Sequence, residues 1–228
     1  MLLRRPTQLL FGAIIFLALF LLTTGLVFSN LTQDWDAASA VQINTANASS
    51  VFSNAMVFLS LYGREWFWIP IVGVMIVLGS RETKILAAEL ALLFVAGIVV
   101  GDTLKTVLVR PRPFETVGGI ITRVPTAGDT NSSYPSGHAL IVSIGAIFSL
   151  VKFRVKWVAL SLTLEAALVC NSRIFVGVHY PMDVLGGVFA GATVVFFGVF
   201  LIEKHGMHWL EFVGYVLWKI TGDGPLKL

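Results

Sequence analysis

The chain has 228 residues, of which 56% are hydrophobic and 13% are charged, and its mean hydropathy is +0.84. A soluble domain carries about 25% charged residues, so this composition excludes a disordered chain, a collagen-like chain and a nucleic-acid-binding domain. It predicts one domain that is an integral membrane protein. The sequence pI of about 9.2 reflects a net charge of only +3, so the positions of the positive charges decide its meaning. A single cysteine, Cys170, excludes a disulfide within the chain.

Six apolar runs predict an all-α, polytopic membrane protein with six transmembrane helices. A bilayer core about 30 Å thick needs about 20 apolar residues in each helix. The first run follows two arginines but is long for a signal-peptide core, so we expect a retained span rather than a cleaved leader. The second run is short unless Val57–Tyr62 extends it. In chain order the runs are Leu9–Phe28, Trp66–Gly79, Ile85–Leu104, Ala139–Val151, Trp157–Cys170 and Val184–Ile202.

Residues 203–228 follow the last run and repeat apolar side chains at helical spacing. This pattern predicts a cytoplasmic amphipathic tail that lies on the inner membrane surface, outside a membrane-embedded core of residues 9–202. Gly97 and Gly101 are spaced one helical turn apart, as are Gly187 and Gly191. Such pairs favour close helix packing within the bundle, and the interface of a homodimer is the alternative use for them.

Lysines and arginines divide into two groups when the N-terminus is placed in the cytoplasm. Cytoplasmic loops are enriched in both residue types, and this orientation puts ten of the sixteen, Arg4 and Arg5 included, on the inner side. We therefore expect a multi-pass protein of the cell membrane with both termini cytoplasmic. The outer cations gather near histidines and prolines, which places the expected site on the extracytoplasmic face. They are Arg64, Lys105, Arg110, Arg112, Arg123 and Arg173.

The first outer stretch, from Lys105 to Pro113, directly follows the third apolar run. Arg110 and Arg112 each precede a proline, which fixes its own backbone and restricts the residue before it. A rigid chain that presents three cations suits phosphate, because guanidinium forks pair with two phosphate oxygens and lysine adds a point charge. A basic flank that anchors a helix at the lipid headgroups is the alternative, and we expect headgroup contact for Arg110.

The second stretch, from Tyr134 to His138, comes just before the fourth run and reads as a helix start with Ser136 near the N-cap. A helix N-terminus has unpaired N–H groups and the positive end of the dipole, so it binds anions. Gly137 lets the backbone approach a ligand closely, and His138 would lie beside the anion. A capping serine next to an unrelated histidine is the simpler alternative.

The third stretch, from Ser172 to Asp183, links the fifth and sixth runs. His179 and Asp183 are four residues apart at an expected helix start, so the carboxylate can accept from one imidazole nitrogen and leave the other as a nucleophile. An interfacial histidine and a capping aspartate are the alternative. A zinc site that also uses His138 is a third possibility, but neighbouring cations would repel the metal.

Together these stretches resemble the motifs of the type 2 phosphatidic acid phosphatase family, which is related to the vanadium haloperoxidases. The family motifs are Lys, six residues, Arg-Pro; then Pro-Ser-Gly-His; then Ser-Arg, five residues, His, three residues, Asp. All three occur here in order and with the same spacing. The matching residues are Lys105, Arg112, Pro113, Pro135, Ser136, Gly137, His138, Ser172, Arg173, His179 and Asp183.

The resemblance implies a metal-independent hydrolase without a cofactor. Its substrate would be a lipid phosphate or diphosphate of the phosphatidate, phosphatidylglycerol phosphate or polyprenyl diphosphate class. By the same resemblance His179 attacks phosphorus and forms a phosphohistidine, Asp183 orients it, and His138 protonates the leaving oxygen and then activates water. The residues implied to hold the phosphoryl oxygens are Lys105, Arg112, Ser136, Gly137 and Arg173.

The sequence is also compatible with three other functions. A phosphatase of a soluble phosphate ester would use the same residues, as would a lipid phosphotransferase whose phosphoenzyme passes phosphate to an alcohol. A channel or transporter is the non-enzyme alternative, and it predicts charges spread through the spans. Here the charges gather at one end of the expected bundle, so the sequence favours a lipid phosphate phosphatase.

Overall fold

The computed structural model describes residues 6–117, 120–121 and 132–228. Arg4 and Arg5, which contribute to the predicted orientation, lie outside these residues, as does Arg123. The described chain is built of helices, with an isolated β-bridge between Gly79 and Leu226. The all-α prediction is therefore confirmed.

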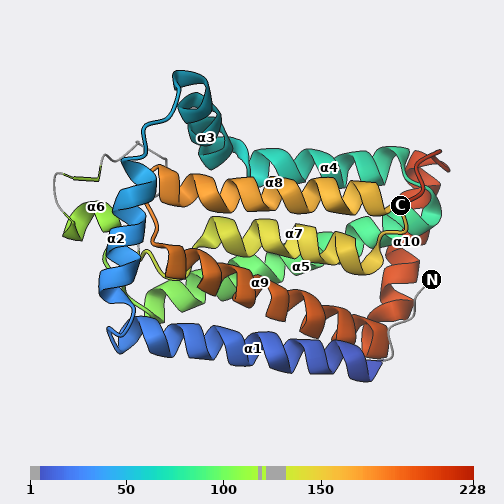
Figure 1. Ribbon diagram of the computed structural model, residues 1–228. Coiled ribbons are helices and arrows are strands. Elements are labelled where there is room, and N and C mark those ends of the chain that lie inside the picture. Colours follow the sequence, from blue (N-terminus) through green and yellow to red (C-terminus); the bar gives the residue numbers. More distant parts are fainter. Residues whose placement is uncertain (1–5, 118–119, 122–131) are drawn as a thin grey trace.

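The helices form an elongated bundle whose long members run nearly side by side (Figure 1). Proline or a polar cap begins several of them: Ser49, Ser80 and Ser136 each accept a hydrogen bond from a backbone N–H of the first helical turn. Within the described ranges the elements are α1 (Pro6–Phe28), α2 (Gln33–Asn44), α3 (Ser50–Tyr62), α4 (Glu65–Leu78), α5 (Arg81–Val107), α6 (Pro113–Thr116), α7 (Gly137–Lys152), α8 (Lys156–Phe175), α9 (Pro181–Leu201), the π-helical turn η1 (Ile202–Gly206) and α10 (Met207–Thr221).

Among the described residues, four segments are long and apolar enough to cross a membrane: α1, α5, α8 and the segment Pro181–Thr221, which contains α9. Helices α3 and α4 together make a fifth candidate, with a bend of 62° between them. Helix α7 corresponds to the fourth predicted run but has only 16 residues. The structure thus shows a membrane protein with four or five candidate spans where the sequence predicts six.

Helix α7 lies at the centre of the bundle and packs against α5, α8 and α9. Its contact with α9 is close because glycines face it. A Cβ atom on Gly187 would lie 2.5 Å from the Ser136 carbonyl oxygen, and one on Gly191 would lie 2.5 Å from that of Leu140. The predicted role of these glycines in helix packing is confirmed inside a single chain.

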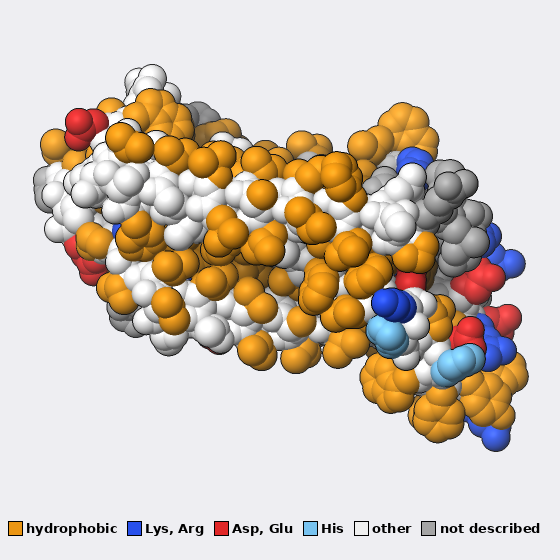
Figure 2. Space-filling view, turned by 90° about the horizontal axis from the view of Figure 1, so that it is seen from below, with side chains coloured by type: hydrophobic (Ala, Val, Ile, Leu, Met, Phe, Trp, Pro, Cys, Tyr) orange, Lys and Arg blue, Asp and Glu red, His pale blue; other side chains and the backbone are white. Residues whose placement is uncertain are grey.

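The outer surface of the bundle is apolar in its middle and polar at its ends. Figure 2 shows hydrophobic side chains covering the centre of one face, with charged side chains gathered toward the two ends. On α1, Phe11 is 65% exposed and Leu21 is 60% exposed. An apolar surface of this extent is unfavourable in water and fits the hydrocarbon core of a bilayer.

Two helices cross the ends of the bundle instead of following its axis (Figure 1). Helix α10 crosses one end, where a Cβ on Gly214 would lie 2.3 Å from Ile85 Cγ1 of α5. Helix α2 crosses the opposite end, within a polar stretch for which the sequence predicts no helix. Both ends of the described chain, Pro6 and Leu228, lie at the α10 end.

We expect the Gly145→Ala variant to lower the free energy of unfolding by about 1–3 kcal/mol, the usual effect of overpacking a core. A Cβ there would lie 2.2 Å from Cη2 of the buried Trp68 ring. Thermal unfolding of detergent-solubilised protein measures the effect. Gly73→Ala is the matched control, because nothing lies within 4 Å of a Cβ at that helical position. A Gly145→Ala protein as stable as the control would contradict this account of the core.

Candidate active site

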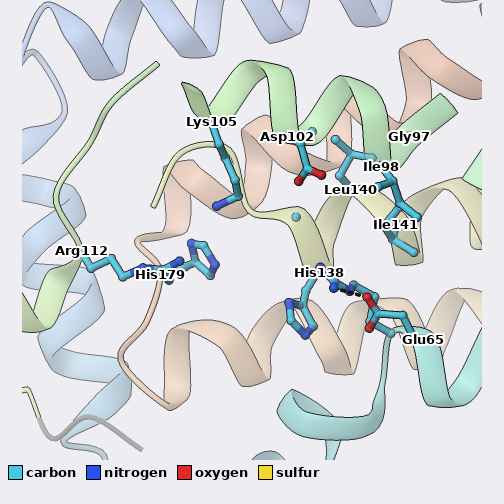
Figure 3. Close-up of a pocket in the computed structure, with 13 residues that line it drawn as sticks. Glu65, Gly97, Ile98, Asp102, Lys105, Arg112, His138, Leu140, Ile141 and His179 are labelled. Carbon is cyan, nitrogen blue, oxygen red and sulfur yellow. Dashed lines mark ion pairs between the residues drawn. The ribbon is translucent and has the colours of Figure 1, made fainter. Parts of the chain in front are cut away.

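A cavity of about 230 Å³ opens at the end of the bundle where α2 and α6 lie. Eight residues are predicted site residues, and the structure brings all of them to this cavity or its immediate wall. The five that line it are Lys105, Arg112, Gly137, His138 and His179. The other three, Ser136, Arg173 and Asp183, are fully buried. Figure 3 shows Arg112 beside His179, with Lys105 and His138 on neighbouring sides of the same space.

The start of α9 places Asp183 against His179. Pro181 is the first residue of the helix, where its missing N–H costs nothing. Asp183 then stands in the first turn, and its Oδ2 accepts a hydrogen bond of 2.9 Å from the Tyr180 N–H. The same oxygen lies 3.5 Å from His179 Nδ1. The helix cap therefore fixes the carboxylate on the Nδ1 side of the imidazole.

The starts of α7 and α9 are joined through their backbones. The Ser136 N–H donates a hydrogen bond of 2.9 Å to the Asp183 carbonyl oxygen. The Ser136 side chain meanwhile caps α7, because its Oγ accepts from the Ala139 N–H at 3.4 Å. His138, the second residue of α7, is thereby held at a set position relative to His179. Three segments far apart in sequence thus converge on one small volume.

Neutral oxygens orient the predicted phosphate-binding cations. Arg112 Nη1 donates to the Val178 carbonyl oxygen at 2.9 Å. Arg173 Nη1 donates to the carbonyl oxygen and the hydroxyl of Ser60, at 3.1 and 2.5 Å. Lys105 Nζ donates to the Ser132 carbonyl oxygen at 2.5 Å. These hydrogen bonds fix the direction in which each cationic side chain extends.

Arg110 does not contact headgroups as the sequence predicts. Its side chain is 11% exposed, and its guanidinium bridges two buried carboxylates, at 2.6 Å to Asp183 and 2.7 Å to Asp36. It also lies 4.1 Å from the centre of the Tyr180 ring, in cation–π contact. Burial lowers the pKa of Arg110, but the charges of the two aspartates outweigh burial and raise it. Arg110 therefore stays charged, and its ion pair helps to hold Asp183 in place.

Asp36 is a site residue that the sequence analysis missed. It lies on α2, is fully buried, and its Oδ1 accepts a hydrogen bond of 2.9 Å from the Met182 N–H in the first turn of α9. Its other oxygen pairs with Arg110. None of the three motifs points to it, and the sole signal in the sequence is an acidic pair, Asp34 and Asp36, inside a polar stretch. A buried carboxylate thus braces the helix start that carries Asp183.

No cluster of three or more metal-ligating side chains is found in the part of the chain that the structure describes. The zinc site considered from the sequence, with His138, His179 and Asp183 as ligands, has no support among those residues. The cavity instead combines two imidazoles, a carboxylate behind one of them, and several cations. This set can attack and neutralise a phosphoryl group.

Known proteins resemble this chain in both sequence and fold. A family model described as the PAP2 superfamily matches residues 86–207, a range that contains all eight predicted site residues. An undecaprenyl-diphosphatase from Sulfolobus acidocaldarius is 40% identical over 160 residues, which cover 70% of this chain and 75% of the relative. Undecaprenyl-diphosphatase BcrC from Bacillus subtilis is 29% identical over 151 residues, with coverage of 65% and 74%.

Two solved structures have a similar fold. A transmembrane PAP2-type phosphatidylglycerolphosphate phosphatase from Bacillus subtilis matches with a TM-score of 0.69 and 21% identity, over 86% of this chain and 98% of that one. Aquifex aeolicus LpxE matches with a TM-score of 0.61 and 21% identity, over 71% and 93%. The family resemblance carried by the three motifs is therefore confirmed, and the chain is a membrane protein of the PAP2 superfamily.

Proposed function

We propose that the chain is a membrane phosphatase that hydrolyses a lipid phosphate or diphosphate, with a polyprenyl diphosphate as its favoured substrate. The observation that carries the proposal is the convergence of His138, His179 and the cations on one cavity. The names of its relatives from Sulfolobus acidocaldarius and Bacillus subtilis, both undecaprenyl-diphosphatases, support the substrate class.

The cavity wall supports a lipid substrate over a soluble one. Charged and polar residues form one part of the lining, whereas Ile98, Leu140 and Ile141 form an apolar part beside them. These three lie on α5 and α7, toward the middle of the bundle, as Figure 3 shows. A phosphate with an attached hydrocarbon tail matches both parts, because each would meet a surface of its own polarity.

In the first chemical step His179 attacks phosphorus. Its Nδ1 faces Asp183, so Nε2 is the nitrogen that faces the cavity and forms the bond to phosphorus. The bond from phosphorus to the leaving oxygen breaks, and His138 donates a proton to that oxygen. Asp183 stabilises the positive charge that develops on the His179 ring.

In the second step water releases the phosphate. His138, now neutral, accepts a proton from a water molecule that attacks the phosphohistidine, and the bond from His179 to phosphorus breaks. Throughout both steps Lys105, Arg112 and Arg173 neutralise the charge on the phosphoryl oxygens, and the N-terminus of α7 at Ser136 and Gly137 contributes N–H groups. These groups supply charge stabilisation without a metal ion.

The proposal extends to the topology of a single membrane-embedded domain with six spans. Helix α7 would be the span that completes the six: it has 16 residues, and most of its side chains are buried among the other helices. The cavity lies at the opposite end of the bundle from Pro6 and Leu228 (Figure 1). That arrangement supports cytoplasmic termini, a tail of residues 203–228 on the inner surface and a site on the extracytoplasmic face.

We expect His179→Ala to abolish phosphate release from polyprenyl diphosphate and from phosphatidate while the protein still folds. The variant lacks the attacking nitrogen. Phosphate release in detergent measures the loss, and His208→Ala is the control, because this histidine is exposed on α10. Near-wild-type turnover by His179→Ala would refute the nucleophile assignment.

Activity is expected to survive EDTA. The cations of the cavity neutralise the phosphoryl charge in the proposed mechanism, so removal of divalent metal ions removes nothing that the reaction uses. The measurement is phosphate release before and after incubation with EDTA. Loss of activity that added metal restores would support a metal site instead.

Asp36→Asn is expected to lower kcat roughly tenfold with little change in KM, an effect within the range of coupling energies in charged networks. The amide keeps an oxygen for the Met182 N–H but no longer pairs with the Arg110 charge, so Asp183 is held less firmly. Steady-state kinetics separate kcat from KM. Asp34→Asn, a change at an exposed neighbour on the same helix, is the control, and an equal loss in both variants would argue against a positioning role.

A further inference from the structure

Arg64 is a cation of the cavity that none of the three motifs contains and that lies outside the residues matched by the family model. It lines the cavity with His138, Lys105 and Arg112. A Cβ atom on Gly137 would lie 3.5 Å from Arg64 Nη1 and 3.7 Å from Lys105 Cε. The Arg64 guanidinium therefore reaches the N-terminus of α7, beside the place where the transferred phosphoryl group is expected.

The bend between α3 and α4 puts Arg64 in this position. α3 ends at Tyr62, and Gly63 lies so close to α8 that a Cβ there would be 2.3 Å from Val169 Cγ2. One turn earlier, Ser60 accepts the hydrogen bonds from Arg173. The segment that carries Arg64 is thus fastened to a residue of the phosphate site.

The bonding of Arg64 is incomplete. Its Nη2 forms an ion pair with the neighbouring Glu65. Its Nε is buried, and no hydrogen-bond acceptor for it exists among the described residues. A buried donor without an acceptor is costly, so the described residues leave part of the hydrogen-bonding capacity of this guanidinium unused. The side chain is 33% exposed, so a ligand in the cavity can reach it.

Arg64 lies near His138 in the wall of the cavity. In Figure 3 its ion-pair partner Glu65 lies next to His138, on the side away from His179 and Arg112. His138 is the residue that protonates the leaving oxygen in the proposed mechanism. A cation near His138 can contact the group that departs, whereas the proposed mechanism uses Lys105, Arg112 and Arg173 to hold the group that is transferred.

We propose that Arg64 binds the second phosphate of a lipid diphosphate, the one that leaves with the lipid. This inference rests on the proposed phosphatase function. The leaving group of a diphosphate is a phosphate monoester that carries negative charge, whereas the leaving group of a phosphomonoester is a neutral alcohol. A guanidinium beside His138 stabilises the first and offers the second little. Arg64 thereby makes the site selective for diphosphates.

A binding experiment tests the second-phosphate subsite directly. Calorimetry on detergent-solubilised protein compares methylenediphosphonate, which cannot be hydrolysed, with orthophosphate. For Arg64→Gln we expect the Kd of methylenediphosphonate to rise roughly 10- to 100-fold, the range for a lost hydrogen-bonded ion pair. The Kd of orthophosphate is expected to rise far less. Arg154→Gln, a change at an exposed arginine far from the cavity, is the control for both ligands.

Two results would overturn the proposal. If Arg64→Gln weakens both ligands by the same factor, Arg64 is a general phosphate ligand or a structural residue; if it weakens neither, Arg64 lies outside the binding site. Glu65→Gln supplies a second variant with the opposite expectation. It removes the competing carboxylate, so methylenediphosphonate should bind more tightly, and weaker binding would also count against the proposal.

Kinetics separate this inference from the proposed function. In wild-type protein the ratio of kcat/KM for polyprenyl diphosphate to that for polyprenyl monophosphate should exceed one, and Arg64→Gln should reduce the ratio roughly 10-fold or more. An unchanged ratio would refute the subsite. If wild-type protein releases phosphate from neither lipid, the proposed function fails, while the calorimetry still decides whether Arg64 binds a second phosphate.

Discussion

The backbone contact between α7 and α9 sets the geometry on which the site depends. The Ser136 N–H donates to the Asp183 carbonyl oxygen at 2.9 Å, and this bond can form because Gly187 and Gly191 let the two helices approach. Any side chain larger than hydrogen at Gly187 would press on the Ser136 carbonyl. The helix starts would then separate, and the two histidines of the cavity would move apart with them. Precise positioning of this kind is what phosphoryl transfer requires.

Ion pairs add to this backbone contact in positioning the site. Asp183 is fully buried, and a buried carboxylate needs a partner of opposite charge. Arg110 provides that pairing, and Asp36 holds Arg110 from the other side. The two acids share one guanidinium, and this network lies behind His179, while the predicted phosphate-binding cations lie at the cavity.

The parts of the site that the sequence predicted are those encoded over short distances. Pro181 and Asp183 make a helix start, Ser136 makes another, and the cations of the first motif lie in the last turn of α5 or shortly after it. Asp36 and Arg110 are 74 positions apart, and their pairing depends on α2 folding across the end of the bundle. Neither residue type nor spacing reveals such a contact. For the same reason Arg110, next to the first motif, was expected to contact headgroups although its partners are buried acids.

The number of spans likewise depends partly on local sequence and partly on contacts between distant segments. Apolar runs predicted the long helices, but the run that became α7 is short because α7 lies inside the bundle and meets neighbours on all sides. The interruption between α3 and α4 has a different cause. Broken helices at membrane depth are tolerated where the freed backbone lines a polar cavity or is buried in protein. Here the break is fastened to α8 at Gly63 and carries Arg64 to the cavity. The bend between α3 and α4 and the position of Arg64 at the cavity thus have one structural origin.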